Sequence, residues 1–271
     1  MPVVRMLYAN QGEDGAWTAS SQVPTLPACH LGDGNRQKTW RSTGAGTCDY
    51  AAVNVCSTSL SVDRVAWVTY NFTTCAFIGI EGDCTSAFAS ASLFATCFAP
   101  WYAGRSGVCF ADLSARQTGK KWWRFIACDT GVDDGYYEVG VFVLGQAACM
   151  AVEVHGDGVR YQLVDPSVVE YAPAGTPKTW RLPPYAVITL PHRFLSESLV
   201  FDTGGGLQDV TRSGGRRADM VLSLYTSAPA CTCMAVATNL YGRLTESPAY
   251  SYVYAGGGQR YDAALTFRES L

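Results

Sequence analysis

The chain has 271 residues, of which 48% are hydrophobic and 16% are charged, so the composition favours a buried core and excludes global disorder. The formal net charge of −3 offers no basic surface for nucleic acid. No window approaches the roughly 18 consecutive apolar residues of a membrane-spanning helix. Residues 1–15 lack the apolar centre of a signal peptide, so we expect the protein to be made and folded in a cytoplasm.

Short apolar or alternating runs recur along the whole chain, and Gly, Pro, Ser, Asn or Asp bound each of them. Runs of this length, together with 27 glycines and 12 prolines, are typical of strands in sandwiches or barrels. The sequence therefore predicts an all-β protein with strands at residues 3–8, 50–56, 61–70, 76–80, 122–128, 136–144, 148–154, 159–164, 186–190, 199–201, 220–225, 234–237, 249–254 and 263–267.

Two segments depart from this strand pattern. Residues 86–98 are rich in Ala, Ser, Leu and Phe, which predicts one short helix. Residues 203–217, TGGGLQDVTRSGGRR, predict a mobile, solvated loop with a cationic tip formed by Arg212, Arg216 and Arg217. The alternative is a segment that becomes ordered against an acidic neighbouring subunit.

A domain boundary is expected shortly after Val143-Leu144-Gly145, where the sequence restarts with a new strand. A segment punctuated by Pro and Gly then follows at residues 165–184. We therefore predict a first domain at residues 1–146 and a second, β-rich domain at residues 147–271.

The most informative segment is residues 120–145, KKWWRFIACDTGVDDGYYEVGVFVLG. It predicts two strands, 122–128 and 136–144, joined by a Gly- and Asp-rich turn at 129–135. This segment resembles the strand pair that ends a discoidin-like (galactose-binding-like) jelly roll in tail proteins of long-tailed bacteriophages. The resemblance lies in the order of four features: Trp-Arg-hydrophobic, an acidic turn, Gly-Tyr-hydrophobic-Glu-hydrophobic-Gly, and a final Leu-Gly. Three further segments resemble the same proteins, at residues 17–44, 62–80 and 240–268.

This resemblance implies a discoidin-like jelly-roll sandwich at the N-terminus, followed by a β-rich assembly domain. It also implies a structural, non-enzymatic component of a phage tail tip or baseplate, located in the virion. The expected partners are other tail proteins and copies of the chain itself in a closed ring, with a trimer as the first guess. One alternative is a carbohydrate-binding tail module that contacts host surface glycans. Another is a tail hub protein that carries an iron–sulfur cluster or another metal.

The eleven cysteines show no CxxC or paired-CxxC zinc spacing. Most lie in strand-like runs, where a free thiol behaves as a small buried hydrophobe, so no cofactor is expected. Disulfides and a metal site are the alternatives. The weak metal candidates are Cys231 and Cys233, which would share one face of an extended segment, together with Cys149.

Other side chains provide little evidence for catalysis. The GxSxG, HExxH, Walker A and Rossmann motifs are absent, and the three histidines, His30, His155 and His192, stand alone in local sequence. Four carboxylates at Asp129, Asp133, Asp134 and Glu138 are consistent with a calcium site, although a solvated turn is the preferred interpretation. Aromatic side chains at Trp17, Trp101 and Tyr102 are assigned to core or interface, with a sugar-stacking site as the alternative.

Overall fold

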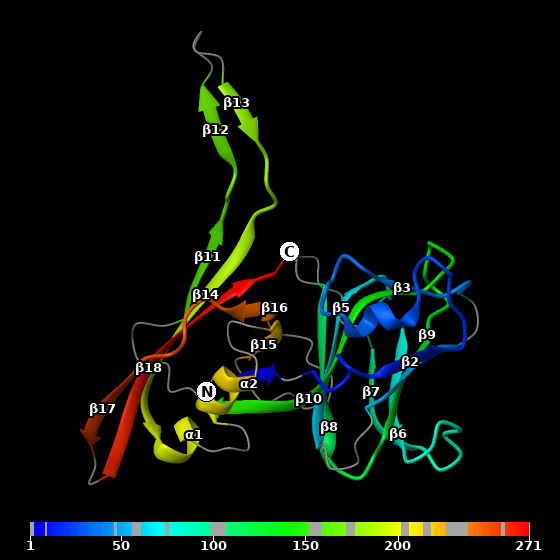
Figure 1. Cartoon of the computed structure of the whole chain (residues 1–271), viewed down its shortest axis with the longest axis horizontal. Helices are drawn as coiled ribbons and strands as arrows, with labels where there is room; N and C mark the ends of the chain where they lie inside the picture. Colours follow the sequence, from blue (N-terminus) through cyan, green and yellow to red (C-terminus); the bar gives the residue numbers. More distant parts are fainter. Residues whose placement is uncertain are drawn as a thin grey trace.

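A computed structural model describes residues 3–8, 10–45, 48–55, 61–73, 76–98, 107–151, 159–171, 177–201, 206–213, 218–225, 238–255 and 258–270. Within these residues the regular secondary structure is almost all β-strand, arranged as a sandwich and a second curled sheet with a long projecting arm (Figure 1). The prediction of an all-β protein with an N-terminal sandwich and a second β-rich part is confirmed. None of the helices in the described part of the chain is long and apolar enough to cross a membrane.

The sandwich consists of two facing sheets. One sheet has the strand order β2-β4-β9-β6-β7. Its strands are β2 (Ala16–Ala19), β4 (Asp49–Asn54), β9 (Trp122–Cys128), β6 (Phe77–Asp83) and β7 (Ser92–Phe98). The other sheet contains β3 (Trp40–Arg41), β5 (Val62–Tyr70), β8 (Val108–Gln117) and the first part of β10 (Glu138–Ala151). A short 3-10 helix, η1 (Ala28–Gly32), lies in the connection before β3.

Alternation of side chains along the strands builds the core of the sandwich. In β9 the even-numbered residues are half-buried, while Trp123, Phe125 and Ala127, on the opposite face, are fully buried. Phe125 packs against Trp40 and Phe142 from the opposite sheet, with ring centroids 5.7 and 5.1 Å apart. The paired tryptophans and the apolar run at 122–128 therefore form a strand because one of its faces supplies large side chains to this core.

The second part of the molecule is a curled sheet with its own apolar core. Its order continues from β10 through β1, β15, β16, β18 and β14 to β11, with β17 paired to β18. The strands are β1 (Val3–Tyr8), β15 (Met220–Tyr225), β16 (Thr238–Leu244), β18 (Gly258–Glu269), β14 (Tyr185–Ser196), β11 (Arg160–Val164) and β17 (Tyr250–Ala255). Two short helices, α1 (Glu197–Phe201) and α2 (Leu207–Ser213), bury Val200, Leu207 and Val210 in this core.

Strand β10 connects the two parts without interruption. Its first residues pair with β5 in the sandwich, and residues 146–151 pair with β1 in the second sheet. It therefore runs through the predicted boundary at residue 146, and Val4, Met6 and Tyr8 of β1 belong to the second core. The division into residues 1–146 and 147–271 stays a prediction.

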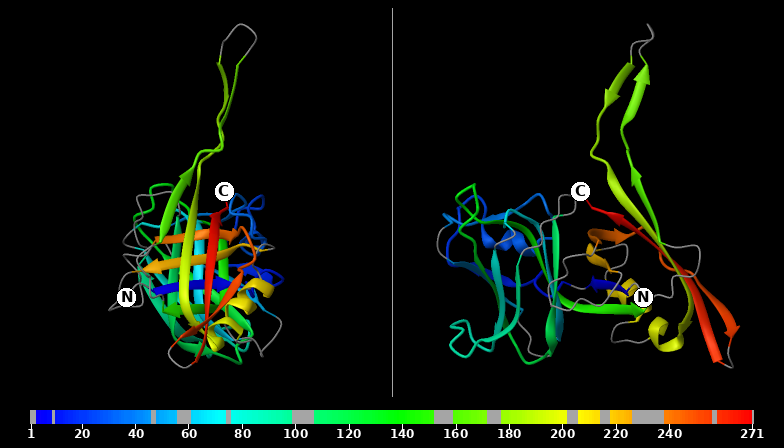
Figure 2. Two further views of the ribbon diagram at one scale, coloured as in Figure 1. Left: turned by 90° about the vertical axis from the view of Figure 1, so that its left-hand side faces the viewer. Right: turned by 180° about the vertical axis from the view of Figure 1, so that it is seen from behind.

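A two-stranded arm projects from the second sheet, and both views in Figure 2 show it extending well beyond the rest of the chain. Its base is the pairing of β11 with the first half of β14. Its outer part is β12 (Val168–Tyr171) paired with β13 (Pro177–Trp180), and every residue of these two strands is exposed.

Three local predictions were wrong. Residues 199–201 were predicted as a strand, but they form the end of helix α1, because a short helix here, packed against α2, buries Val200 in the second core. Residues 92–98 form β7 in place of the helix predicted at 86–98, because β6 offers them an antiparallel partner edge from Phe77 to Gly82. Within the predicted loop at 203–217, residues 207–213 form helix α2, because Leu207 and Val210 lie three residues apart and share one buried face. Arg212 is exposed on α2, and Arg216 and Arg217 lie outside the described residues.

Candidate functional site

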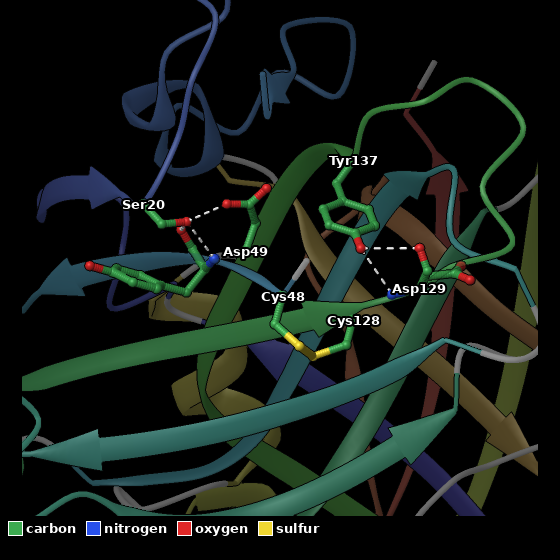
Figure 3. The surroundings of a disulfide bond; sticks show 7 residues. Ser20, Cys48, Asp49, Cys128, Asp129 and Tyr137 are labelled. Atoms are coloured by element: carbon green, nitrogen blue, oxygen red, sulfur yellow. Dashed lines mark hydrogen bonds between the residues drawn. A yellow bond between two sulfur atoms is a disulfide. The ribbon is translucent and has the colours of Figure 1, made fainter. Parts of the chain in front are cut away.

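Several connections meet at one end of the sandwich, which we call the loop end. They are the segments after β2, between β3 and β4, after β5, and between β9 and β10. Figure 3 shows the frame that holds them, in which polar side chains surround a disulfide bond between Cys48 and Cys128. The prediction of free thiols was therefore wrong for these two cysteines, because neighbouring strands β4 and β9 bring them together.

Each bonded cysteine precedes an aspartate that organises a loop. Asp49 accepts a hydrogen bond of 2.7 Å from the hydroxyl of Ser20. The Asp129 carboxylate accepts hydrogen bonds from the Thr73 amide at 2.6 Å, the Thr73 hydroxyl at 2.9 Å and the Gly131 amide at 2.9 Å. Both aspartates are buried, so these donors compensate the loss of water around the two charges.

Tyr137, the residue immediately before β10, completes the frame. Its hydroxyl accepts a hydrogen bond from the Asp129 amide at 2.9 Å and donates one to the Asp129 carbonyl at 3.1 Å (Figure 3). The Tyr137 amide donates to the hydroxyl of Ser42 at 2.8 Å. The ring is fully buried and packs against Phe72, so this one residue connects the β9–β10 loop with the loops after β3 and after β5.

A partly exposed group of five side chains lies beside this frame, and we call it the Arg41 cluster. The Arg41 guanidinium donates to one oxygen of Glu138 at 2.6 and 3.0 Å, and it lies 4.1 Å from the ring centroid of Tyr136. The Asn71 amide donates to the Asp134 carboxylate at 3.2 Å and to the Tyr136 carbonyl at 2.8 Å. The side chains of Arg41 and Glu138 are 32% and 23% exposed.

The Arg41 cluster combines three kinds of chemistry at one accessible place. The guanidinium and the Asn71 amide carry N–H donors, and Glu138 and Asp134 carry carboxylate acceptors. The ring of Tyr136 adds an aromatic surface. A ligand with many hydroxyl groups can both donate to and accept from such a set, so the cluster suits recognition of polyhydroxylated molecules.

The four carboxylates predicted as a possible calcium site have separate roles. Asp129 points into the buried frame, Asp134 accepts from Asn71, and Glu138 accepts from Arg41, while Asp133 is exposed. Across the described part of the chain no group of three or more His, Cys, Asp and Glu side chains could hold a metal ion. The solvated-turn interpretation fits Asp133 and Asp134, which are both exposed.

The cysteines singled out as metal candidates fall largely outside what the structure describes. Cys149 lies on β10 opposite Arg5 of β1, and its side chain is not among those described. Cys231 and Cys233 lie outside the described residues. Their assignment to an iron–sulfur cluster or zinc stays a prediction. Of the other described thiols, Cys109 is buried, while Cys29 and Cys84 are exposed.

The predicted aromatic and histidine candidates do not join the Arg41 cluster. Trp17 is half-buried, donates to the Gly12 carbonyl at 2.9 Å and packs edge-on against Phe142, so it belongs to the sandwich core. Trp101, Tyr102 and His155 lie outside the described residues. His30 contacts the Thr39 carbonyl at 3.0 Å, and His192 is buried in the second core.

Sequence reasoning missed a polar cavity of about 730 Å³ between the sandwich and the second sheet. Its charged lining is Glu13, Asp33, Arg36, Asp219, Arg243, Arg268 and Glu269. Burial, followed by the negative charges of Asp14 and Asp219, raises the pKa of the Glu13 carboxyl. The cavity combines residues that lie far apart in sequence, so no local motif could have indicated it. Most of its charges already have protein partners, including Arg243 with Asp219 at 2.7 Å.

No family model and no curated protein matches this sequence. Among solved structures, the chain is similar to chitosan-binding module 1 of a chitosanase/glucanase from Paenibacillus sp. IK-5, with 20% identity and a TM-score of 0.41, covering 51% of this chain and 98% of the module. It is similar to the family 32 carbohydrate-binding module of C. perfringens NanJ in complex with galactose, with 17% identity and a TM-score of 0.40, covering 51% and 98%. It is also similar to a pectin-binding module, with 12% identity and a TM-score of 0.38, covering 48% and 89%.

All three of these proteins are carbohydrate-binding modules, and they match about half of this chain. At these identities and TM-scores their ligands do not transfer to it. The resemblance to phage tail proteins has no counterpart in these comparisons and stays a prediction.

Proposed function

We propose that this protein binds carbohydrate at the loop end of its sandwich and that it acts by binding and not by catalysis. The observation that carries the proposal is the Arg41 cluster, in which a guanidinium, two carboxylates, an amide and a tyrosine ring lie together, partly exposed, on a frame fixed by the Cys48–Cys128 disulfide. Binding sites need such preorganised polar groups, because a site that must be ordered on binding loses affinity.

The test is a glycan array probed with the full chain, followed by calorimetric titration of the best oligosaccharide, with chitotriose and galactose as fixed probes. We expect Arg41→Gln to weaken binding at least about tenfold, since a tenfold change corresponds to roughly 1.4 kcal/mol, the size of one charge-assisted hydrogen bond. Replacing Tyr136 by Ala is expected to act in the same direction.

The chain contains a matched control for Arg41. Arg124 on β9 also pairs with a glutamate, Glu81 at 2.7 Å, and also lies over an aromatic ring, Phe88 at 4.2 Å, but it belongs to the middle of the smaller sheet. Arg124→Gln is expected to bind glycans as the wild type does. Absence of any glycan binding at millimolar concentration, or equal losses from both substitutions, would overturn the proposal.

A second candidate function is that of a structural component of a phage tail tip or baseplate. The observation that favours it is the arm, whose outer strands expose every residue and carry large apolar side chains. Such a surface is typical of proteins that join assemblies. The two functions are compatible, because a tail component can carry a glycan-binding sandwich. Electron microscopy of virions with an antibody against this chain tests the second function, and labelling anywhere but the tail would contradict it.

A further inference from the structure

Large exposed apolar side chains concentrate on the projecting arm. The arm comprises residues 159–171 and 177–184, which include β11, β12 and β13. Tyr171 is 72% exposed and Trp180 is 52% exposed. The other exposed large apolar residues of the arm are Val159, Tyr161, Leu163, Val168, Val169 and Leu182. Isolated apolar residues on a surface are ordinary, but a contiguous group of this size marks an interaction surface.

The outer part of the arm has no support within its own chain. Strands β12 and β13 pair only with each other among the described residues, and all eight of their residues are exposed. An isolated two-stranded ribbon is at best marginally stable in water and needs a third strand or an apolar partner. The outer edge of β12 is suited to accept a further strand, because β12 contains no proline, whereas β13 begins with Pro177.

A second open edge lies elsewhere on the same molecule. Strand β17 pairs with β18 along one side, and none of the strands that the structure describes pairs with its other side. Its sequence, YSYVYA, has no charged residue to discourage strand pairing. Tyr252 is 55% exposed and Tyr254 is 72% exposed, so this edge also carries aromatic side chains.

The arm and the β17 edge lie at opposite ends of one long strand pair. Strand β14 runs from the arm to the other end of the sheet, paired with β18 from Val187 to Ser196. In Figure 1 the arm points upward while the β17–β18 hairpin points down and to the left, and Figure 2 shows the same separation. The two surfaces therefore cannot meet within one molecule, but they can meet between molecules.

We propose that the arm of one copy docks on a second copy of this chain, with β12 added as a further strand along the open edge of β17. Main-chain hydrogen bonds would satisfy both edges, and Val169 and Tyr171 would pack near Tyr252 and Tyr254. The described arm residues, 159–171 and 177–184, number 21, so the contact reaches the low end of the roughly 20–30 residues per side of a stable interface when the rest of the arm lies along the second copy beside β12.

The contact is head-to-tail, because the docking surface and the receiving surface differ. A heterologous contact of this kind forms a closed ring when its rotation closes. A ring would also present several loop ends together, which would raise the avidity of weak glycan binding without any new contact to the sugar. The docking itself does not depend on the proposed glycan binding.

The test is sedimentation velocity of the full chain across concentration, with two matched double variants. The arm variant is V169E/Y171E and the receiving-edge variant is Y252E/Y254E. In each, two alternate residues of one exposed strand become acidic. We expect the wild type to form oligomers and each double variant to sediment as a monomer of 29.2 kDa. Leu93→Glu, at a residue 54% exposed on β7, is the control and is expected to assemble normally.

Mixing the two double variants distinguishes this contact from other modes of assembly. One variant keeps an intact receiving edge and the other keeps an intact arm, so the mixture is expected to form a one-to-one complex of twice the chain mass. Circular dichroism identical to wild type shows that each variant is folded. A wild type that stays monomeric, a Y252E/Y254E variant that still assembles, or a mixture that stays monomeric would overturn the proposal.

Discussion

His192 is a titratable side chain placed in an apolar environment. Alternation along β14 puts it on the same face as Ile188 and Leu190, in the core that also contains Leu207 of α2. It is 2% exposed, and neither ring nitrogen has a hydrogen-bond partner among the described residues. Burial lowers the pKa of the His192 imidazole to about 4. The neutral form is therefore the one that the fold accepts.

This burial makes stability depend on pH. In the unfolded chain His192 binds its proton near pH 6.5, whereas the folded chain binds it only near pH 4, so stability rises with pH between these values. The stability of the folded chain is therefore not reduced by His192 above pH 6.5. As the pH falls from 6.5 toward 4, protonation of His192 in the unfolded chain lowers the free energy of unfolding by about 3 kcal/mol.

Urea unfolding at pH 7.5 and pH 4.5 tests this dependence. We expect wild type to lose about 2–3 kcal/mol more than His192→Leu over that interval, because the variant has no proton to bind. The two proteins would be compared each against its own value at pH 7.5, which removes the effect of the substitution on packing. Equal losses in both proteins would contradict the prediction.

At the scale of elements, the Cys48–Cys128 disulfide joins the residue before β4 to the end of β9 across 80 residues of sequence. Closing a loop of this length restricts the unfolded chain, which stabilises the fold by up to about 4 kcal/mol. We expect Cys48→Ser with Cys128→Ser to lower the urea midpoint and to weaken glycan binding, because Asp49 and Asp129 lie next to the lost bond. Cys84→Ser is the control, since Cys84 is an exposed free thiol. An unchanged midpoint in the double variant would show that strand pairing alone holds the loop end.

Sequence patterns predicted those elements whose signals are local. The strand at residues 122–128 was predicted with its observed bounds, because tryptophans and alternating apolar residues suit a half-buried strand. The second strand of the pair was predicted to stop at 144, but β10 continues to Ala151. Gly145 suggested a break there, yet it is buried and pairs with Arg64 of β5. Tertiary pairing decided that boundary.

Other features depend on contacts that no local pattern reports. The pairing of Cys48 with Cys128 cannot be deduced from the spacing of eleven cysteines. Residues 165–184 show only Pro and Gly punctuation, although they form the outer arm, because a ribbon exposed on all sides has no buried face to impose alternation. In the Arg41 cluster, Glu138 was noticed only as a carboxylate, and its partner Arg41 lies 97 positions earlier. Such partners become visible only when the fold brings them together.

At the scale of the whole molecule, a buried ion pair connects the sandwich to the second sheet. Arg36, from the connection before β3, donates to the Ser270 carbonyl at 2.8 Å and lies 3.6 Å from the Glu269 carboxylate. Glu269 is 4% exposed and also accepts from the Ala186 amide at 3.0 Å. The end of β18 is thereby held against the sandwich, at the rim of the polar cavity.

Removing the cation of this pair is expected to cost more than removing an exposed one. Arg36→Met leaves the Glu269 charge buried without its partner, so we expect a loss of about 3 kcal/mol in urea unfolding. Adding Glu269→Gln should restore part of this loss, as a double-mutant cycle would measure. Lys38→Met, which removes a solvent-exposed cation paired with Asp33, should leave stability unchanged. Equal effects of the two single variants would show that the Arg36 pair contributes nothing beyond a surface contact.

The position of β1 in the middle of the larger sheet has a consequence for synthesis on the ribosome. Residues 3–8 are translated before either of their partner segments, which are residues 146–151 on one side and residues 221–225 on the other. All strands of the sandwich are translated well before residues 221–225, so the sandwich can fold while residues 3–8 still lack this partner strand. A segment that is made before both of its partner strands is a natural binding site for chaperones during translation. Premature termination before residue 221 would leave it with one open edge, and such fragments would be prone to aggregate.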